Sequence, residues 1–548
     1  MKRWTFLLLL FFLDPVSSAT AQVAKAASPC AGPKGIASVS PKVLNALTLT
    51  TKMPNPHEAG KKAIEIASQP GSGLKVAYVL KDNNGVIIRY AIAVVSAPNC
   101  YAATMVFHSE QNFPRPHDPE PLVDVFGHSR SPFVARVNVL HFSKTGAEFE
   151  TRPDGHVSQL IDPKRGLAIV HGLNGAQRVS VEDHNHNRTV FQKGRLGYVQ
   201  HPFSYRGHEF AKRTFFYHGH AYSHLYAVAP PQTSSTSPIR FSYGYGYREM
   251  FLDVYAPSFY YGQAFYGWVY NPWLSPIAYG WGWAGNSWFG YYGYYFAPYP
   301  SYPSASYWLT DYMISSDLQT AYDAHQDAGE VDGIPPTQDG PPILTPEIKQ
   351  QVADEVNGNL ALENQEAQLN AAQLKGHNLE VAIGSSSIYR LLNDASQGRP
   401  HVFMVGTPLD VVDASRTECT LSDGDVLSLR SAPSPGTIVN LVVLLSKGGQ
   451  ECQNQSTVSV SWNYLQEMQN HMRAIIDQGL KELVAKQGKG GLPLLPSGAR
   501  AAPVPSHYAA FAPPPDPNAA IEIQRLAQQA DQAEKEVITE VSRQGGTQ

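Results

Sequence analysis

Charged residues are scarce in this sequence. They make up 16% of the 548 residues, and 42 basic against 46 acidic side chains leave a formal net charge of −4. A protein that binds nucleic acid needs a clustered basic surface, so we expect no nucleic-acid partner. Hydrophobic residues reach 43%, which is enough for buried cores and argues against a chain that is disordered throughout.

The sequence also lacks a long hydrophobic run. The apolar stretch at residues 5–13 follows Lys2 and Arg3, and it is well short of the ~20 residues that span a bilayer. The small residues Ala-Thr-Ala follow at 19–21. This order predicts a secretory signal peptide at 1–21, cleaved after Ala21, and no membrane helix after cleavage. We therefore expect an exported protein that is periplasmic, associated with the outer envelope or extracellular.

Only four cysteines are present, namely Cys30, Cys100, Cys419 and Cys452. No C-x-x-C occurs, so the sequence supports neither a thioredoxin-like site nor a cysteine-based zinc site. An even number in an exported chain favours disulfides over free thiols. We expect the local pairs Cys30–Cys100 and Cys419–Cys452, because the other pairings would require the first and last domains to pack together.

Recognisable catalytic motifs are missing. The chain has no P-loop, no H-E-x-x-H and no EF-hand loop, and its carboxylates are too scattered to nominate a glycosidase pair. Gly127-His-Ser-Arg-Ser131 is close to the G-x-S-x-G turn of hydrolases, but Ser131 replaces the final glycine and Pro132 follows. A strand rather than a helix comes next, so we interpret this segment as a polar turn. We expect no enzyme activity, no catalytic residue and no cofactor.

The pattern along the chain predicts a multi-domain protein that is mainly β with separate helices. Residues 30–131 form a small α+β unit, with a helix at 56–67 and strands at 76–80, 86–95 and 102–107. Residues 132–230 form an antiparallel β-hairpin meander, because turn signals such as Asn174-Gly175 recur about every 9–13 residues.

The second half alternates between aromatic, helical and β segments. The predicted units are an irregular aromatic region rich in Tyr, Trp, Gly and Pro at 231–307, helices with a Pro/Gly linker at 308–374, a small SH3-like β-barrel with a trailing helix at 399–487, a Gly/Pro linker at 488–517 and an amphipathic helix at 518–543. Individual helices are expected at 305–326, 346–369 and 464–486. The Glu and Gln content of 346–369 indicates a solvated or self-associating helix.

Several segments resemble a family of exported bacterial proteins without an assigned function. The similar segments are Phe-Tyr-Gly-Trp-Val-Tyr-Asn-Pro-Trp at 265–273, Tyr-Gly-Trp-Gly-Trp at 279–283, Phe-Ala-Pro-Tyr-Pro-Ser-Tyr-Pro-Ser-Ala at 296–305, Trp-Leu-Thr-Asp-Tyr at 308–312, Leu-Gln-Glu-Met at 465–468 and Gln-Gly-Lys-Gly-Gly-Leu at 487–492. The resemblance implies export and this architecture, but it brings no catalytic residues. It does not cover the first 130 residues.

Two sets of residues are candidate site residues. Flat aromatic rings can stack on sugar faces or on protein partners, and the stacking candidates are Trp268, Trp273, Trp281, Trp283 and Trp288. The alternative, which we favour slightly, is that most of these rings form an internal core. His218, His220 and His224 form a weaker candidate for a metal site, since Gly219 predicts a turn that leaves the orientation of the imidazoles open.

We therefore expect a non-enzymatic binding or scaffolding protein of the cell envelope. Its partner would be a cell-envelope protein or a polysaccharide, and its helices could support a homo-oligomer. The first alternative is an exported metal-binding protein or hydrolase that uses the meander histidines. The second is an outer-membrane barrel, which frequent prolines and polar helices disfavour.

Overall fold

The computed structural model describes residues 56–107, 139–229, 240–328, 343–374 and 388–545, with short gaps inside most of these stretches, as well as residues 42, 43 and 46. The predicted signal peptide, Cys30, the turn at 127–131 and His218 lie outside the described residues. All structural statements below concern the described part of the chain.

The N-terminal unit contains one helix and one small sheet. Helix α2 (Pro56–Ala67) has the predicted bounds, and it turns Ala63, Ile66 and Ala67 inward. Strands β1 (Leu74–Lys81), β2 (Ile87–Ala97) and β3 (Cys100–Phe107) pair antiparallel in the order β1-β2-β3. The predicted helix and three strands are confirmed.

A ten-stranded antiparallel sheet follows, and it confirms the predicted meander. Each of its strands β4 to β12 pairs with the next along the chain, and β15 is added at the β12 edge. Glycines with positive φ, such as Gly175 (76°) and Gly194 (66°), occupy turns between strands. The strands are β4 (Val139–Phe142), β5 (Glu148–Thr151), β6 (Val157–Asp162), β7 (Leu167–His171), β8 (Gln177–Glu182), β9 (Arg188–Gln192), β10 (Gly197–Tyr205), β11 (His208–Tyr217), β12 (His220–Ala229) and β15 (Leu252–Ala256).

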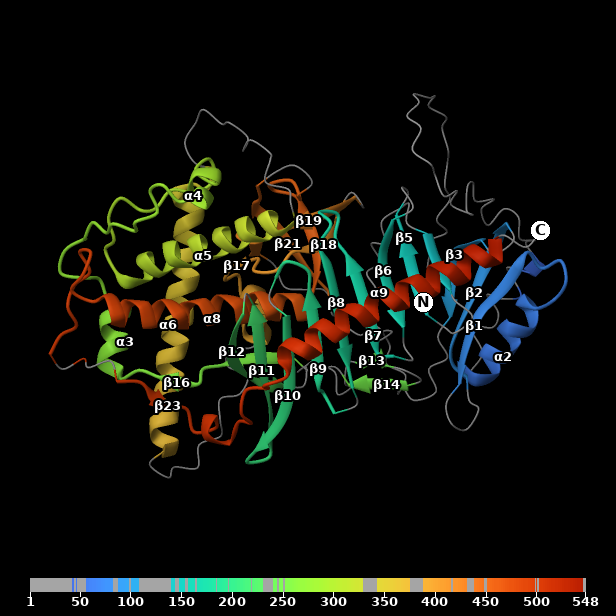
Figure 1. The fold of residues 1–548 in the computed structure, drawn as a ribbon, viewed down its shortest axis with the longest axis horizontal. Helices are drawn as coiled ribbons and strands as arrows, with labels where there is room; N and C mark the ends of the chain where they lie inside the picture. The colour runs from blue at the N-terminus through green and yellow to red at the C-terminus, as the bar shows by residue number, and fades with distance from the viewer. Residues whose placement is uncertain are drawn as a thin grey trace.

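Helices cover both faces of this sheet (Figure 1). Helix α9 (Ala519–Gly545) returns across the strands on one face, where Leu526 and Ala530 pack with Val179. Helix α8 (Trp462–Lys486) lies on the other face, where Ala474 packs with Ala211. Because strand residues alternate between faces, each strand contributes to both layers.

The aromatic region is more regular than expected. It contains the hairpin β13 (Arg240–Tyr243) and β14 (Gly246–Glu249), the short strand β16 (Phe259–Tyr260), and the helices α3 (Gln263–Tyr270) and α4 (Ser287–Tyr291). The two helices were missed because one or two turns are too short to show a helical period. They pack beside α5 (Ala305–Ala328) and α6 (Pro346–Leu374), near the positions predicted for helices.

The expectation of a solvated helix holds for only one face of α6, where Gln351, Asp354 and Gln365 are exposed, and self-association stays a prediction. Its apolar residues Val352, Val356 and Leu360 are buried, and so are the polar side chains of Glu363 and Glu366. The helix contacts α3, α5 and α8. Many of its polar residues are thus buried inside the protein, and composition alone does not distinguish them from the residues of a solvated face.

The C-terminal module is a six-stranded sheet with strand order β17-β20-β21-β22-β18-β19. No pairing joins the end strands β17 and β19 among the described residues, so the expected closed SH3-like barrel is not confirmed. Cys419 and Cys452 form the predicted disulfide, whereas the predicted Cys30–Cys100 bond involves a residue outside the described ranges. The elements are α7 (Ile388–Ser396), β17 (His401–Met404), β18 (Leu409–Asp413), β19 (Glu418–Leu421), β20 (Val426–Leu429), β21 (Ile438–Leu445) and β22 (Thr457–Ser461), followed after α8 by β23 (Val504–Pro505) and the 3-10 turn η2 (Ala509–Phe511).

Across the described stretches, no helix is both long enough and apolar enough to cross a bilayer.

Candidate functional site

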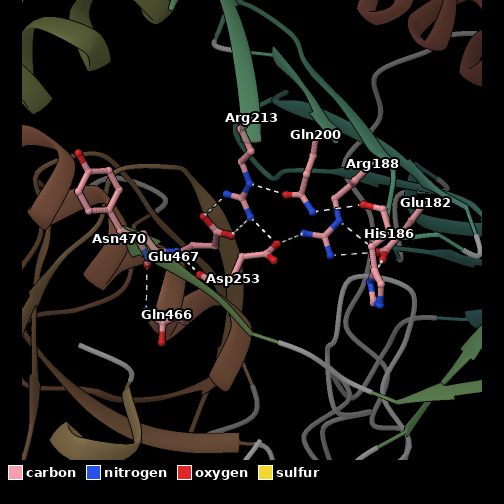
Figure 2. Close-up of polar contacts among 10 residues, drawn as sticks. Glu182, His186, Arg188, Gln200, Arg213, Asp253, Gln466, Glu467 and Asn470 are labelled. Atoms are coloured by element: carbon pink, nitrogen blue, oxygen red, sulfur yellow. Dashed lines mark hydrogen bonds and ion pairs between the residues drawn. The ribbon is translucent and has the colours of Figure 1, made fainter. Parts of the chain in front are cut away.

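The meander face that meets α8 carries a buried network of charged side chains, with Arg213 of β11 at its centre (Figure 2). The Arg213 guanidinium donates two hydrogen bonds of 2.9 Å to Glu467 of α8 and one of 2.7 Å to Asp253 of β15. Its Nε donates to the side-chain oxygen of Gln200 on β10 at 2.7 Å. These bonds tie β10, β11 and β15 to α8.

A second guanidinium extends the network along the sheet (Figure 2). Arg188 of β9 donates from Nη1 to Asp253 at 3.2 Å. Its Nε and Nη2 donate to Glu182 of β8 at 3.1 and 3.0 Å. Asp253 is therefore shared by two guanidiniums, and each carboxylate of the network lies against an arginine.

The electrostatics keep the Arg213–Glu467 pair ionised. Burial alone would raise the pKa of Glu467, but the charge and hydrogen bonds of Arg213 hold this pKa below its ordinary value. Burial would lower the pKa of Arg213, and the negative charge of Glu467 raises it instead. The Arg213 guanidinium carbon also lies 4.0 Å from the ring centre of Tyr226. A general base needs an available lone pair and a pKa near the working pH. Glu467 has neither, so we interpret the Arg213 network as a structural element and not as a proton-transfer site.

A small cavity of about 40 Å³ lies beside the network at the start of α8. Its polar lining comes from β8, β9, β15 and α8, namely Arg178, Ser180, Arg188, Asp253, Asn463, Gln466 and Glu467. A polar cavity of this size has room for a few water molecules. Small-molecule sites are much larger, at roughly 300–1,000 Å³, so the cavity does not fit an organic substrate.

A pair of buried carboxyl groups joins α6 to α8. Glu363 and Asp477 are hydrogen-bonded to each other and lie next to Arg473. Burial raises the pKa of Glu363 well above its ordinary value, and the charge of Asp477 raises it further. The hydroxyl groups of Tyr255 and Tyr266 donate to Asp477 and Glu363, respectively. Two adjacent buried carboxyl groups disfavour double ionisation, and both are sealed from solvent.

The aromatic rings of 259–312 form the inner part of a large core. Trp281 stacks between Trp283 and Trp308, at ring-centre distances of 4.3 and 4.8 Å, and Trp308 stacks on Tyr312 at 5.4 Å. These four residues form a stacked column, which we call the ring column. Trp308 is completely buried, whereas Trp281 and Trp283 are partly exposed.

The five predicted stacking residues therefore have different environments. Trp288 is buried, and both faces of Trp281 are covered by other rings. Trp268 and Trp273 are partly exposed, with ring centres 5.8 Å apart. The structure brings Trp281, Trp283 and Trp288 together and places Trp268 beside Trp273. Stacking on a ligand stays a prediction.

One end of the molecule presents apolar side chains to solvent. Leu274 is fully exposed, Tyr270 is half exposed, and Leu494 is exposed on a second loop. The two loops meet, because a Cβ added to Gly491 would lie 2.3 Å from the carbonyl oxygen of Ala278. We define the aromatic end as α3 with the loops 271–286 and 487–495; α3 and the later loop lie at the left of Figure 1.

The aromatic end is also unusually poor in charge. From Val254 to Thr310 the chain contains no Asp, Glu, Lys, Arg or His. From the sequence we noted that this region is rich in aromatic residues, but we did not note that the region lacks charged residues. The Arg213 network had a weaker signal, namely charged residues such as Lys212 and Arg213 in the middle of a β-strand.

The histidine candidates are not gathered into a site by the described residues. His220 is exposed, and His224 packs on the rings of Phe215, Tyr222 and Tyr255. Burial, with a further contribution from the charge of Lys481, lowers the pKa of His224 to about 4. Within the described ranges, no group of three or more His, Cys, Asp or Glu side chains is placed to hold a metal ion. The expected turn at Gly219 is present, with a φ of 83°.

In comparisons with known proteins, no protein-family model, no curated protein and no solved structure matches this chain. The resemblance of the aromatic motifs to a family of exported proteins therefore stays a prediction.

Proposed function

We propose that this protein is an exported, non-catalytic docking and scaffolding protein of the cell envelope, and that the aromatic end is its docking surface. The observation that carries the proposal is the exposure of Leu274, Tyr270 and Leu494 on a surface whose longer segment has no charged residue. Exposed apolar patches on a soluble protein mark interaction sites.

The packing behind this surface supports a docking role, because it fixes the loops in place. Ile277 of the first loop exchanges backbone hydrogen bonds of 3.0 and 2.8 Å with Tyr302, and the hydroxyl of Tyr302 donates to the buried Asp311 at 2.7 Å. Lys349 of α6 forms an ion pair of 2.6 Å with the same carboxylate and lies 3.6 Å from the ring centre of Tyr299. A preorganised surface loses less conformational entropy when it binds.

The contacts between modules support a scaffolding role. Arg152 of the meander donates to Asp410 and Glu418 of the C-terminal sheet at 2.7 and 3.0 Å. His401 of that sheet lies 2.9 Å from Glu355 of α6. These mostly buried contacts orient the C-terminal sheet against the meander and against α6.

Export is part of the same proposal, and the charged start, short apolar run and Ala-Thr-Ala at 19–21 support it. N-terminal sequencing of the chain recovered from the envelope fraction tests it. We expect the processed chain to begin at Gln22. An unprocessed chain in the cytoplasm would overturn the assignment of location.

Co-sedimentation tests the docking role. Removing the whole aromatic segment would unfold the core, so the test uses the full chain and the double variant Tyr270→Ser/Leu274→Ser, mixed with isolated peptidoglycan, outer membranes or exopolysaccharide. We expect the wild-type chain to sediment with one of these materials and the double variant to lose most of that binding. The matched control is Ile521→Ser on α9, an exposed apolar residue outside the aromatic end. Equal binding by all three proteins would contradict the proposal.

A further inference from the structure

We propose that the aromatic end docks on the interface of an anionic phospholipid bilayer, with Leu274 inserted among the headgroups. This inference rests on the proposed docking function and names its partner. Three features of the described surface lead to it, namely its lack of acidic groups, its pattern of protruding side chains and the lysines at its edge.

The absence of charge favours lipid over sugar. Binding of a polysaccharide requires polar side chains beside the stacking ring, because sugar hydroxyls must exchange hydrogen bonds with water for hydrogen bonds with protein. Between Val254 and Thr310 no acidic or basic residue is present, so only amide and hydroxyl groups such as those of Asn271 and Ser275 are left to supply them. The ring of Trp281 is also unavailable to a sugar, since Trp283 and Trp308 cover both of its faces.

The protruding residues match the composition of a membrane interface. Trp and Tyr are enriched where headgroups meet hydrocarbon, and partly exposed Trp268, partly exposed Trp273 and half-exposed Tyr270 lie close to the fully exposed Leu274. Leu494 adds a second exposed apolar side chain on the adjoining loop. A shallow apolar patch of this kind is suited to insertion at the depth of the headgroups rather than to spanning the bilayer.

Lysines at the edge of the aromatic end complement an anionic surface. Lys481, Lys486 and Lys489 are exposed near the C-terminal end of α8 and on the following loop. Glu482 is the only acidic residue between 478 and 499, and it pairs with Lys486 at 3.0 Å. The segment therefore carries a net positive charge next to the exposed leucines. Each basic residue near an anionic leaflet strengthens binding by several fold.

Vesicle flotation tests the inference with the full chain. The probes are vesicles of phosphatidylcholine alone and vesicles of phosphatidylcholine with phosphatidylglycerol. We expect the chain to float with the anionic vesicles and to dissociate as salt is raised. Leu274→Ser should weaken binding about tenfold or more, since it removes one inserted side chain. Lys489→Glu should weaken binding about tenfold or more on anionic vesicles and change little on neutral ones.

The control is Ile521→Ser, which should float like the wild-type chain. Circular dichroism of each variant checks that the fold is intact. Wild-type flotation of both Leu274→Ser and Lys489→Glu would overturn the inference. If the wild-type chain fails to float but sediments with peptidoglycan or exopolysaccharide, the lipid partner is wrong and the docking function stands. If it binds none of these materials, both are wrong.

Discussion

The Arg213 network and the ring column are two interior regions of one chain that differ in the charge of their side chains. The network places two guanidiniums against three carboxylates between the meander and α8, whereas the ring column is built from uncharged aromatic side chains at the far end of the core. Burying ions is costly unless each is paired, but correct pairing requires one relative position of the two layers. Aromatic packing also stabilises the folded state strongly, but it constrains the relative position of two layers less than paired charges do. The comparison indicates that charge defines how modules join and that rings supply cohesion at the exposed end.

Trp308→Ala should have the largest effect on stability. Trp308 is completely buried and stacks on both Trp281 and Tyr312 in the ring column. We expect a loss of about 4–5 kcal/mol in the free energy of unfolding, measured by urea denaturation. Trp283→Ala, at the partly exposed end of the same column, should cost clearly less. Equal losses for Trp308→Ala and Trp283→Ala would contradict the description of Trp308 as the buried end and Trp283 as the partly exposed end of the ring column.

Arg213→Met tests the charged half of the comparison. The change leaves Glu467 without its bidentate partner and removes one of two partners from Asp253, so we expect a loss of about 3–4 kcal/mol. Adding Glu467→Gln should recover part of this loss, because the unpaired charge of Glu467, whose side chain is 34% exposed, is then gone. Arg525→Met, at an exposed position on α9, is the control and should change stability by less than about 0.5 kcal/mol. A double variant no better than the single one would argue against the ion-pair interpretation.

Gly491→Ala tests how the two loops of the aromatic end meet. Gly491 has a φ of 96°, and its added Cβ would collide with the carbonyl oxygen of Ala278 at 2.3 Å. We expect a loss of about 2 kcal/mol in unfolding free energy, together with weaker binding in the co-sedimentation assay. Gly262→Ala is the matched control, since nothing lies within 4 Å of its added Cβ. If Gly262→Ala lowered the unfolding free energy by a similar amount, the effect of Gly491→Ala could not be assigned to the contact between the two loops.

Glu363→Gln should stabilise the protein, by an amount that depends on pH. The folded-state pKa of Glu363 is raised by burial and by Asp477, so the folded state holds more protons than the unfolded state above about pH 4.3. Wild-type stability therefore falls as pH rises through this window. Gln does not titrate, so we expect no difference near pH 4 and a gain of about 1–2 kcal/mol at pH 8.

Thermal unfolding across pH measures the gain at Glu363. Glu482→Gln is the control, because Glu482 belongs to an exposed pair with Lys486 and should contribute less than about 0.5 kcal/mol at any pH. A constant difference between Glu363→Gln and the wild-type chain at all pH values would contradict the raised folded-state pKa of Glu363.

Local sequence patterns predicted much of the fold. The helices at 56–67 and near 346 followed from capping residues and the meander from turn residues, and the helix near 305 followed from its apolar spacing. Contacts between distant segments could not be predicted in this way. Strand β15 joins the sheet beside β12, and α9 returns to cover β8–β11. The local sequence of β15 or of α9 does not indicate which strands it contacts.

The candidate site was less predictable than the fold. The tryptophans were singled out for their type, but which ring is buried depends on packing between α3, α5 and the loops, as the difference between Trp288 and Trp283 shows. The exposed Leu274 carried no signal as a single residue. The charge-free stretch from Val254 to Thr310 did carry one, and a search for missing residue types would have found it.

The return of α9 across the meander has a consequence for the order of folding during synthesis. Strand β12 ends at Ala229 and α9 begins at Ala519, so about 290 residues must be added after β12 is made before the outer face of the sheet can be covered. At about 5–20 residues per second, that delay is roughly 15–60 s. The apolar side chains that later meet Leu526 and Ala530 are bare during this interval. The outer face of the sheet therefore stays uncovered until the last helix of the chain emerges, during synthesis and during export alike.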